Sequence, residues 1–233
     1  MTRVIRIKRQ SDKDSMPYWQ EFAYEGDQGG SVAAALNALN ARTPLTDTTG
    51  KETESIAWEC GCMVRKCGAC AMRINGLPAL ACSTFLNSIK KDVIIIEPLS
   101  KFPVVKDLIV DRSVIFDNMK KMAVWLESEA FLTDYTHEQR YQSARCLMCG
   151  CCLEVCPNFS FSGDFAGSAA PVNVFRILDE EQNPEHRKEI LEHYQKTFFE
   201  GCGKSMSCHD ICPAGIPVEE LMVRSNAAAI WKR

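Results

Sequence analysis

Alternating apolar and polar residues near the N-terminus predict an opening β-hairpin. Residues 4–8 alternate apolar with basic side chains, and residues 19–24 are rich in aromatic ones, a pattern typical of paired strands. Ser31 is a suitable N-cap for an alanine- and leucine-rich helix over residues 32–39. Residues 71–75 and 93–97 predict two more strands. We therefore expect the first part of the chain to form a small α+β domain.

The apolar spacing becomes helical after Phe102 and Pro103. Over residues 105–126 the apolar side chains fall on one helical face, which predicts an amphipathic helix whose methionines pack in the core. Further helices are expected over residues 171–178, from Asn183-Pro184 to near residue 199, and from Pro217 onward. We therefore predict two domains, residues 1–103 and residues 104–233, of which the second is all α.

Composition narrows the class of protein. The net charge of −3 and the pI of about 5.9 argue against a nucleic-acid partner, because there is no basic excess to neutralise phosphates. The N-terminus reads as a strand rather than a signal peptide, and no apolar run approaches the ~18 residues of a membrane span. Thirteen cysteines are therefore expected to be reduced, cytoplasmic and bound to metal.

Two stretches of the second domain share one cysteine pattern. The row starting at Cys146 reads C-x2-C-x2-C-x3-C-P, and the row starting at Cys202 is the same with Ser205 in place of its second cysteine. In two-cluster bacterial ferredoxins, three cysteines of such a row bind one iron–sulfur cluster and the fourth binds the other. The predicted [4Fe–4S] ligands are Cys146, Cys149, Cys152 and Cys212, and the predicted [3Fe–4S] ligands are Cys156, Cys202 and Cys208.

The first domain carries a third group of cysteines, with plant-type [2Fe–2S] spacing. Its predicted ligands are Cys62, Cys67, Cys70 and Cys82. Gly68 and Ala69 are small, so the backbone there can approach a cluster closely. If Cys60 replaced Cys62, the spacing to Cys67 would change from x4 to x6. If Cys151 replaced Cys152, both spacings around that position of its row would change. We expect both spare cysteines to be ordinary small buried residues.

Zinc is the alternative metal, because C-x2-C pairs are also common in zinc sites. A zinc-stabilised binding module without a redox role is therefore a rival from another functional class. Eleven of the thirteen cysteines fall into the three iron–sulfur spacings, which favours clusters. The histidines form no metal pattern. We expect His186 and His193, on a charged helix, to be solvated, and His209 to have a surface or core role.

Several motifs together resemble the iron–sulfur subunit of succinate dehydrogenase and fumarate reductase, over nearly the whole chain. Besides the cysteine rows, the motifs are Cys67-Gly-Ala-Cys70-Ala-Met, Leu80-Ala-Cys82-Ser-Thr-Phe-Leu86, Phe102-Pro103-Val-Val-Lys-Asp107-Leu-Ile-Val-Asp111 and Asp164-Phe165-Ala-Gly167. The resemblance implies an α+β fold: an N-terminal β-grasp domain like plant-type ferredoxin, followed by an all-α domain like bacterial ferredoxin. It implies the same cysteine ligands for all three clusters.

The resemblance also implies partners and a function. Electrons would pass between the FAD of a flavoprotein subunit and a membrane quinone, so that this chain is part of an oxidoreductase yet has no catalytic residue itself. A membrane anchor, which could carry haem b, would hold the chain at the cytoplasmic side of the membrane. The [2Fe–2S] cluster would face the flavin, and the [3Fe–4S] cluster would face the quinone.

The chain departs from the family near the expected quinone site. Ubiquinone-reducing members commonly show a tryptophan pair after the first Cys-Pro and a histidine after the first cysteine of the last row, where this chain has Ser160, Phe161 and Gly203. We therefore favour menaquinone, with Phe161, Gly203 and Lys204 as quinone-proximal residues. The rival within redox biology is a soluble flavin-dependent reductase that takes electrons from a thiol or ferredoxin. The direction of the reaction is not encoded in this chain.

Overall fold

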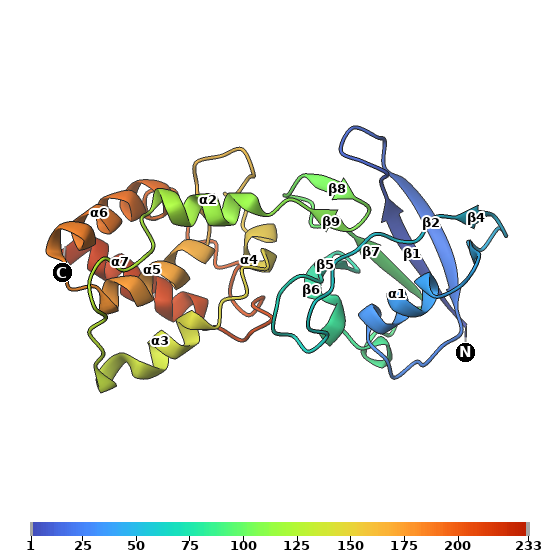
Figure 1. Cartoon of the computed structure of the whole chain (residues 1–233), viewed down its shortest axis with the longest axis horizontal. Coiled ribbons are helices and arrows are strands. Elements are labelled where there is room, and N and C mark those ends of the chain that lie inside the picture. Colours follow the sequence, from blue (N-terminus) through green and yellow to red (C-terminus); the bar gives the residue numbers. More distant parts are fainter. Residues whose placement is uncertain (1, 232–233) are drawn as a thin grey trace. The chain divides into compact units, whose positions relative to one another are not determined.

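The computed structural model describes residues 2–231, and the chain forms two compact units divided between Asp111 and Arg112. In the first unit a mixed sheet has the strand order β2-β1-β7-β5-β6, and it is seen with α1 in Figure 1. The strands β1 and β7 are parallel and the other pairs antiparallel. The bounds of these elements are β1 Arg3–Arg9, β2 Tyr18–Tyr24, α1 Val32–Asn40, β5 Ala71–Ile74, β6 Leu77–Leu80 and β7 Val93–Glu97.

The predicted elements of this unit are confirmed. The opening hairpin forms with Arg3 opposite Tyr24, and Ser31 caps α1 by accepting a hydrogen bond from the amide of Ala34. The core lies between α1 and the sheet, where Ile5, Ile7, Phe22 and Leu36 are fully buried. Smaller elements complete the unit: β3 Leu45–Thr46, β4 Glu52–Thr53, β8 Val104–Lys106, β9 Ile109–Val110, and the 3-10 turns Ala81–Ser83 and Leu86–Ser88.

The helix predicted over residues 105–126 is wrong at both ends. Residues 104–110 form the β8–β9 pair, and α2 covers only Ser113–Lys121. At the start, the reason is Asp107, a left-handed residue with φ 47° whose carboxylate is bound to Arg9. At the end, Ala123 has a left-handed φ of 53°, which terminates α2. The contact between Asp107 and Arg9 also explains why the first unit extends beyond the expected boundary at residue 103. The methionine prediction is confirmed at Met122, which is fully buried.

The second unit is helical around two hydrophobic clusters. Its helices are α2, α3 His137–Ala144, α4 Cys151–Glu154, α5 Ala169–Glu180, α6 Pro184–Tyr194 and α7 Val218–Trp231, with a 3-10 turn at Asp134–Thr136 and a π-helical turn at Gln195–Phe199. Asn183 caps α6 as predicted. Within residues 2–231 no helix is both long enough and apolar enough to cross a membrane.

Candidate iron–sulfur sites

The loop around Cys62 is shaped to hold a negative charge. Cys62 Sγ accepts hydrogen bonds from the backbone amides of Val64 at 3.4 Å and Lys66 at 3.1 Å. The loop can do this because Met63 and Arg65 adopt left-handed backbone angles, φ 56° and 58°, and alternating left-handed residues turn successive N–H groups toward one point. The amides of Val64 and Lys66 lower the pKa of Cys62 to about 7.

The other three predicted ligands of the first unit follow Cys62 along the same stretch of chain. Cys67 hydrogen-bonds with Cys62, and the charges of Cys82 and Cys67 act on Cys70. The hydrogen bond from the amide of Ala81 to the carbonyl of Cys70, 3.0 Å long, brings Cys82 back to Cys70. Burial raises the pKa of Cys70 to about 12. One short stretch of chain thus gathers all four thiols.

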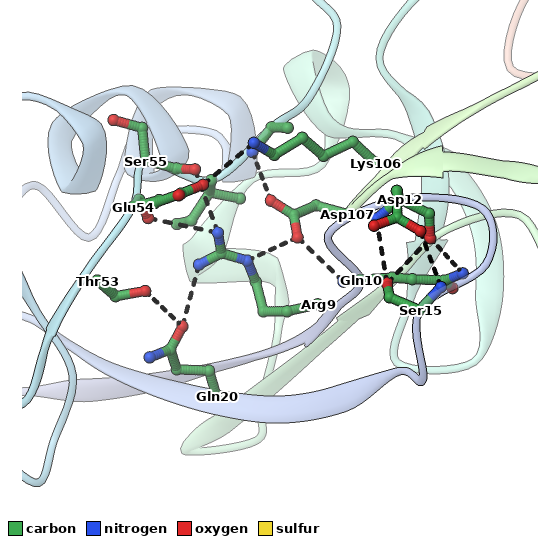
Figure 2. Close-up of polar contacts among 12 residues, drawn as sticks. Arg9, Gln10, Asp12, Ser15, Gln20, Thr53, Glu54, Ser55, Lys106 and Asp107 are labelled. Carbon is green, nitrogen blue, oxygen red and sulfur yellow. Dashed lines mark hydrogen bonds and ion pairs between the residues drawn. The ribbon is translucent and has the colours of Figure 1, made fainter.

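A buried ion pair anchors the chain that leads into this loop. Figure 2 shows Arg9 directed at Asp107, with Arg9 Nε 2.9 Å from Asp107 Oδ1. Both residues are almost inaccessible to solvent, at 2% and 1% exposure. Burying such charges is tolerable only when each is paired and hydrogen-bonded. Here the Asp107 carboxylate also accepts from the amides of Gln10 and Ala57, at 3.0 and 2.9 Å.

The Arg9 guanidinium also holds the segment that leads into the Cys62 loop. Its Nη2 donates to the carbonyls of Glu54 at 3.3 Å and Ser55 at 3.2 Å, and its Nη1 donates to Gln20 Oε1 at 3.0 Å. The segment so held ends shortly before Cys60. Sequence reasoning missed this pair, although Arg9 shares the inward face of β1 with Ile5 and Ile7, and a charge on an inward face signals a buried partner.

In the second unit the two cysteine rows run antiparallel. At one end Arg145 Nη2 donates to the carbonyl of Ala214, and at the other Asn158 Nδ2 donates to the carbonyl of Gly201, both at 2.6 Å. The start of each row therefore lies against the end of the other. This arrangement places Cys212 near Cys146, and Cys156 near Cys202.

The first thiol group of this unit contains a cysteine from each row. Burial raises the pKa of Cys146, and the charges of Cys149 and Cys212 raise it further. Desolvation, and then the charges of Cys149, Cys146 and Cys212, likewise raise the pKa of Cys152. Cys146 and Cys212 pack against one hydrophobic cluster. The structure thus brings together the four predicted [4Fe–4S] ligands.

Two further side chains, Asn173 and Cys151, lie beside the sulfur atoms of this thiol group. Asn173 Nδ2 lies 3.6 Å from Cys146 Sγ. The side chain of Cys151 hydrogen-bonds with Cys149 and lowers the pKa of that thiol to about 7. Cys151 is fully buried as expected, whereas Cys60, the other spare cysteine, is exposed and that prediction is wrong.

The second thiol group borders a pocket of about 360 Å³, a volume that includes space open to solvent. Cys156, Cys202 and Cys208 line it, and the charges of Cys156 and Cys202 act on Cys208, whose pKa is raised mainly by burial. Ser205 also lines this pocket, as do Gly203 and Lys204, while Phe161 is not among the lining residues.

The two rows repeat one backbone conformation at equivalent positions. Met148 and Lys204 both adopt left-handed φ, at 50° and 53°, and so do Gly150 and Met206, at 86° and 56°. Left-handed conformations at three non-glycine residues are unusual and tend to occur where a backbone has a functional shape. The rows diverge afterwards, because α4 forms after Gly150 and only turns follow Met206.

One histidine prediction is wrong. His186 is 1% exposed, and its Nδ1 lies 3.1 Å from Glu181 Oε2, because the N-terminus of α6 folds back onto the end of α5. His193 and His209 have side chains that are 45% and 49% exposed. Among residues 2–231, no three His, Cys, Asp or Glu side chains are arranged around a single metal ion.

The amides aimed at Cys62 and the grouping of the thiols fit iron–sulfur clusters, which are held by thiolates and tuned by hydrogen bonds to sulfur. Comparison with known proteins agrees. The family described as a 2Fe-2S iron-sulfur cluster binding domain matches residues 1–117, and the family described as a 4Fe-4S dicluster domain matches residues 142–216.

Two relatives match almost end to end. The succinate dehydrogenase iron-sulfur subunit of Bacillus subtilis is 33% identical over 94% of this chain and 89% of its own length. The fumarate reductase iron-sulfur subunit of Wolinella succinogenes is 28% identical over 93% and 91%. A chain of the Mycobacterium smegmatis Sdh1 complex in the apo form has the same fold, with a TM-score of 0.80 at 20% identity, over 100% of this chain and 97% of that one.

Proposed function

The chain belongs to the family of succinate dehydrogenase and fumarate reductase iron–sulfur subunits, and from this we propose its function in detail. It carries electrons between the FAD of a flavoprotein subunit and a membrane quinone, through [2Fe–2S], [4Fe–4S] and [3Fe–4S] clusters. The clusters supply one-electron carriers, and the protein sets their positions and potentials through ligands, hydrogen bonds and burial. The dicarboxylate chemistry takes place on the partner.

We assign the cluster ligands by the thiol groups of the structure. Cys62, Cys67, Cys70 and Cys82 hold the [2Fe–2S] cluster, supported by the amides that donate to Cys62. Cys146, Cys149, Cys152 and Cys212 hold the [4Fe–4S] cluster, and Cys156, Cys202 and Cys208 hold the [3Fe–4S] cluster. The observation that supports the exchanged fourth ligand is the antiparallel arrangement of the rows.

Ser205 makes the third cluster one iron short. It lines the pocket beside Cys156, Cys202 and Cys208, in the place where a complete row has a cysteine. A hydroxyl is far less acidic than a thiol, so it is a poor iron ligand. The potential of an iron–sulfur cluster depends on its type, and we expect the three-iron cluster to have the higher potential of the two clusters in this unit. A high potential suits the last carrier before a quinone.

The quinone is proposed to approach this pocket. Gly203 and Lys204 line it, so we keep both as quinone-proximal residues. A Cβ at Gly203 would lie 3.3 Å from Asn158 Nδ2, so a larger residue there would crowd the opening. Phe161 is retained on the sequence argument alone, and the departures from ubiquinone-reducing members still favour menaquinone. A membrane anchor would hold the chain peripherally at the cytoplasmic side of the membrane.

Iron analysis and EPR test this function. The complex purified anaerobically should contain about nine irons per chain, two, four and three in the proposed clusters, and a [3Fe–4S] signal when oxidised. Ser205→Cys should add about one iron and abolish that signal, because the fourth iron gains a thiolate. Ser207→Cys is the matched control, since Ser207 Oγ lies 3.2 Å from Ser205 Oγ. About four irons, or an equal amount of zinc, would refute the proposal, and purification without any membrane subunit would favour the soluble reductase.

A further inference from the structure

The segment that joins α2 to α3, residues 122–136, presents large apolar side chains to solvent. It is the yellow-green connection between these two helices in Figure 1. Trp125, Phe131, Leu132 and Tyr135 are 45%, 54%, 66% and 87% exposed. Large apolar side chains gathered on a surface mark a place where another molecule binds.

Hydrogen bonds hold the first half of this segment against the C-terminal end of α5. The amide of Glu127 donates to the Glu181 carboxylate at 2.6 Å, and the amide of Phe131 donates to the carbonyl of Glu180 at 2.9 Å. The backbone of the segment therefore faces α5, and its apolar side chains are left on the outside.

The second half is fixed at the same end of α5. Thr136 Oγ1 donates to Asp179 Oδ2 at 2.6 Å, and the buried Arg140 donates to the carbonyl of Thr133 at 2.5 Å and pairs with Asp179 at 3.0 Å. Since residues 179–181 are consecutive, the whole segment lies around one helix end. A surface fixed in this way loses little conformational entropy when a partner binds.

The segment is acidic as well as apolar. Residues 122–136 contain no lysine or arginine. The carboxylates of the segment are all exposed and belong to Glu127, Glu129 and Asp134. Within residues 2–231, neither Glu129 nor Asp134 has an ion-pair partner for its side chain. Negative charge therefore surrounds the apolar side chains without being neutralised by this chain.

This charge selects the kind of molecule that fits. An anionic lipid surface is disfavoured because its headgroups would meet these carboxylates, and a second copy of the chain would place like charges opposite each other. A protein segment with lysine or arginine between apolar residues fits both properties, because its cations pair with the carboxylates and stack on Trp125 and Tyr135. A surface this apolar is best covered by a resident subunit.

We propose that residues 125–135 are a docking surface for a segment of another subunit of the complex, one in which lysine or arginine side chains lie between apolar ones. The inference rests on the proposed function because it needs a complex with other subunits. None of these residues is a proposed cluster ligand or lines the pocket beside Cys208. The proposal thus assigns a role to a face that the electron-transfer sites do not use.

Carbodiimide coupling of the purified complex tests this, because the reagent joins a carboxylate to a lysine amine that is in direct contact with it. Glu129 or Asp134 should couple to a lysine of another subunit, in a peptide that mass spectrometry identifies. Leu132→Ser should largely abolish the coupling while keeping the full iron content, because the side chain is mostly exposed. Val223→Ser is the matched control, since Val223 on α7 is 64% exposed, and it should leave the coupling unchanged.

The other outcomes contradict the inference. Coupling to a second copy of this chain would make the surface a self-interface, and labelling by a lipid-soluble photoreagent instead of coupling would make it face the membrane. Coupling that persists in Leu132→Ser, or is lost equally in Val223→Ser, would show that the apolar side chains do not form the contact. A complex with about nine irons per chain and no coupling would overturn the inference alone, whereas about four irons would refute the proposed function.

Discussion

The two units gather their thiols in different ways. In the first unit one stretch of chain supplies all four, and backbone amides of that stretch bring the pKa of Cys62 down to about 7. In the second unit the thiols come from two separated rows, and burial raises the pKa of Cys146, Cys152 and Cys208. Each unit also has the other kind of thiol, because burial raises the pKa of Cys70 to about 12 and the hydrogen bond from Cys151 lowers that of Cys149 to about 7. The clear difference is therefore whether one stretch of chain or two separated rows supply the thiols.

The way each unit gathers its thiols affects how strongly cluster insertion and folding are coupled. A thiol whose pKa is raised by burial is protonated at neutral pH, so only bound iron keeps it as a thiolate. Metal binding and folding are coupled where the ligands must be deprotonated and brought together. Cluster insertion should therefore contribute more to the folding of the second unit, where the ligands must be brought together from two separated rows, than to that of the first unit, where one stretch of chain supplies them.

The largest expected effect comes from removing the fourth [4Fe–4S] ligand, which the second cysteine row supplies. Cys212→Ala should abolish the [4Fe–4S] signal although Cys146, Cys149 and Cys152 remain, because the fourth thiolate comes from the other row. Cys151→Ala is the control and should keep the cluster, since Cys151 only donates to Cys149. Low-temperature EPR of the reduced complex measures both. A [4Fe–4S] signal that persists in Cys212→Ala would remove the distinction between the units.

A substitution in the loop around Cys62 should affect only the [2Fe–2S] centre. Cys62→Ser should impair the [2Fe–2S] centre alone, because the whole site is local to that loop, and Cys60→Ser should leave it nearly intact. Cys60 is exposed, and no described amide is directed at it as those of Val64 and Lys66 are at Cys62. The [2Fe–2S] EPR signal is the measurement. An unchanged signal in Cys62→Ser would identify Cys60 as the ligand.

The anchor of the first loop can be removed without touching a cysteine. Asp107→Asn should cost about 3–5 kcal/mol of stability in the first unit, because it leaves Arg9 as an unpaired buried charge. Asparagine also tolerates the left-handed backbone at this position, so the change removes the charge and one of the two acceptor oxygens without straining the backbone. Lys106→Gln breaks an exposed pair with Glu54 and should cost about 0–1 kcal/mol.

Urea unfolding monitored by β-strand circular dichroism compares the two variants. The [2Fe–2S] content should fall in Asp107→Asn while the two clusters of the second unit are retained. Equal stability of the two variants would show that the Arg9–Asp107 pair does not anchor the loop.

The smallest expected effect concerns a buried carboxylate of the second unit. Burial alone would raise the pKa of Glu181, but hydrogen bonds from Ser128, Asn183 and Glu127 and the charge of His186 hold it at about 2. The folded pKa lies below the ordinary value near 4.3, so this stability is present above pH ~4.3 and is lost as the pH falls toward 2. Glu181→Gln should therefore destabilise the unit by on the order of 2 kcal/mol at pH 7.

Urea unfolding at a series of pH values measures that difference. Trp125, whose ring lies 5.7 Å from that of His186, provides a nearby fluorescence signal. The deficit of Glu181→Gln should shrink as the pH falls below ~4.3, whereas Glu189→Gln, on the exposed side of α6, should show little deficit at any pH. A deficit that grew on acidification would mean that folding raises the pKa of Glu181 instead of lowering it.

The sequence by itself determined the local features of this protein. Ser31 and Asn183 predicted two helix starts because a cap acts on the adjacent turn. The cysteine spacings predicted three thiol groups because each spacing reflects how a short loop encloses its cluster. The family motifs extended this to the whole chain, and the family and the overall fold are confirmed by the comparisons. The ligand assignments remain predictions.

Only the tertiary structure decided features whose cause lies far away in the chain. Residues 105–126 have helical spacing, yet Asp107 is held in a left-handed conformation by Arg9, almost a hundred positions earlier. His186 looked solvated because its helix is charged, and it is buried because Glu181 folds against it. Periodicity and capping act over a few residues, whereas a buried charge or hydroxyl is placed by whichever distant group satisfies it.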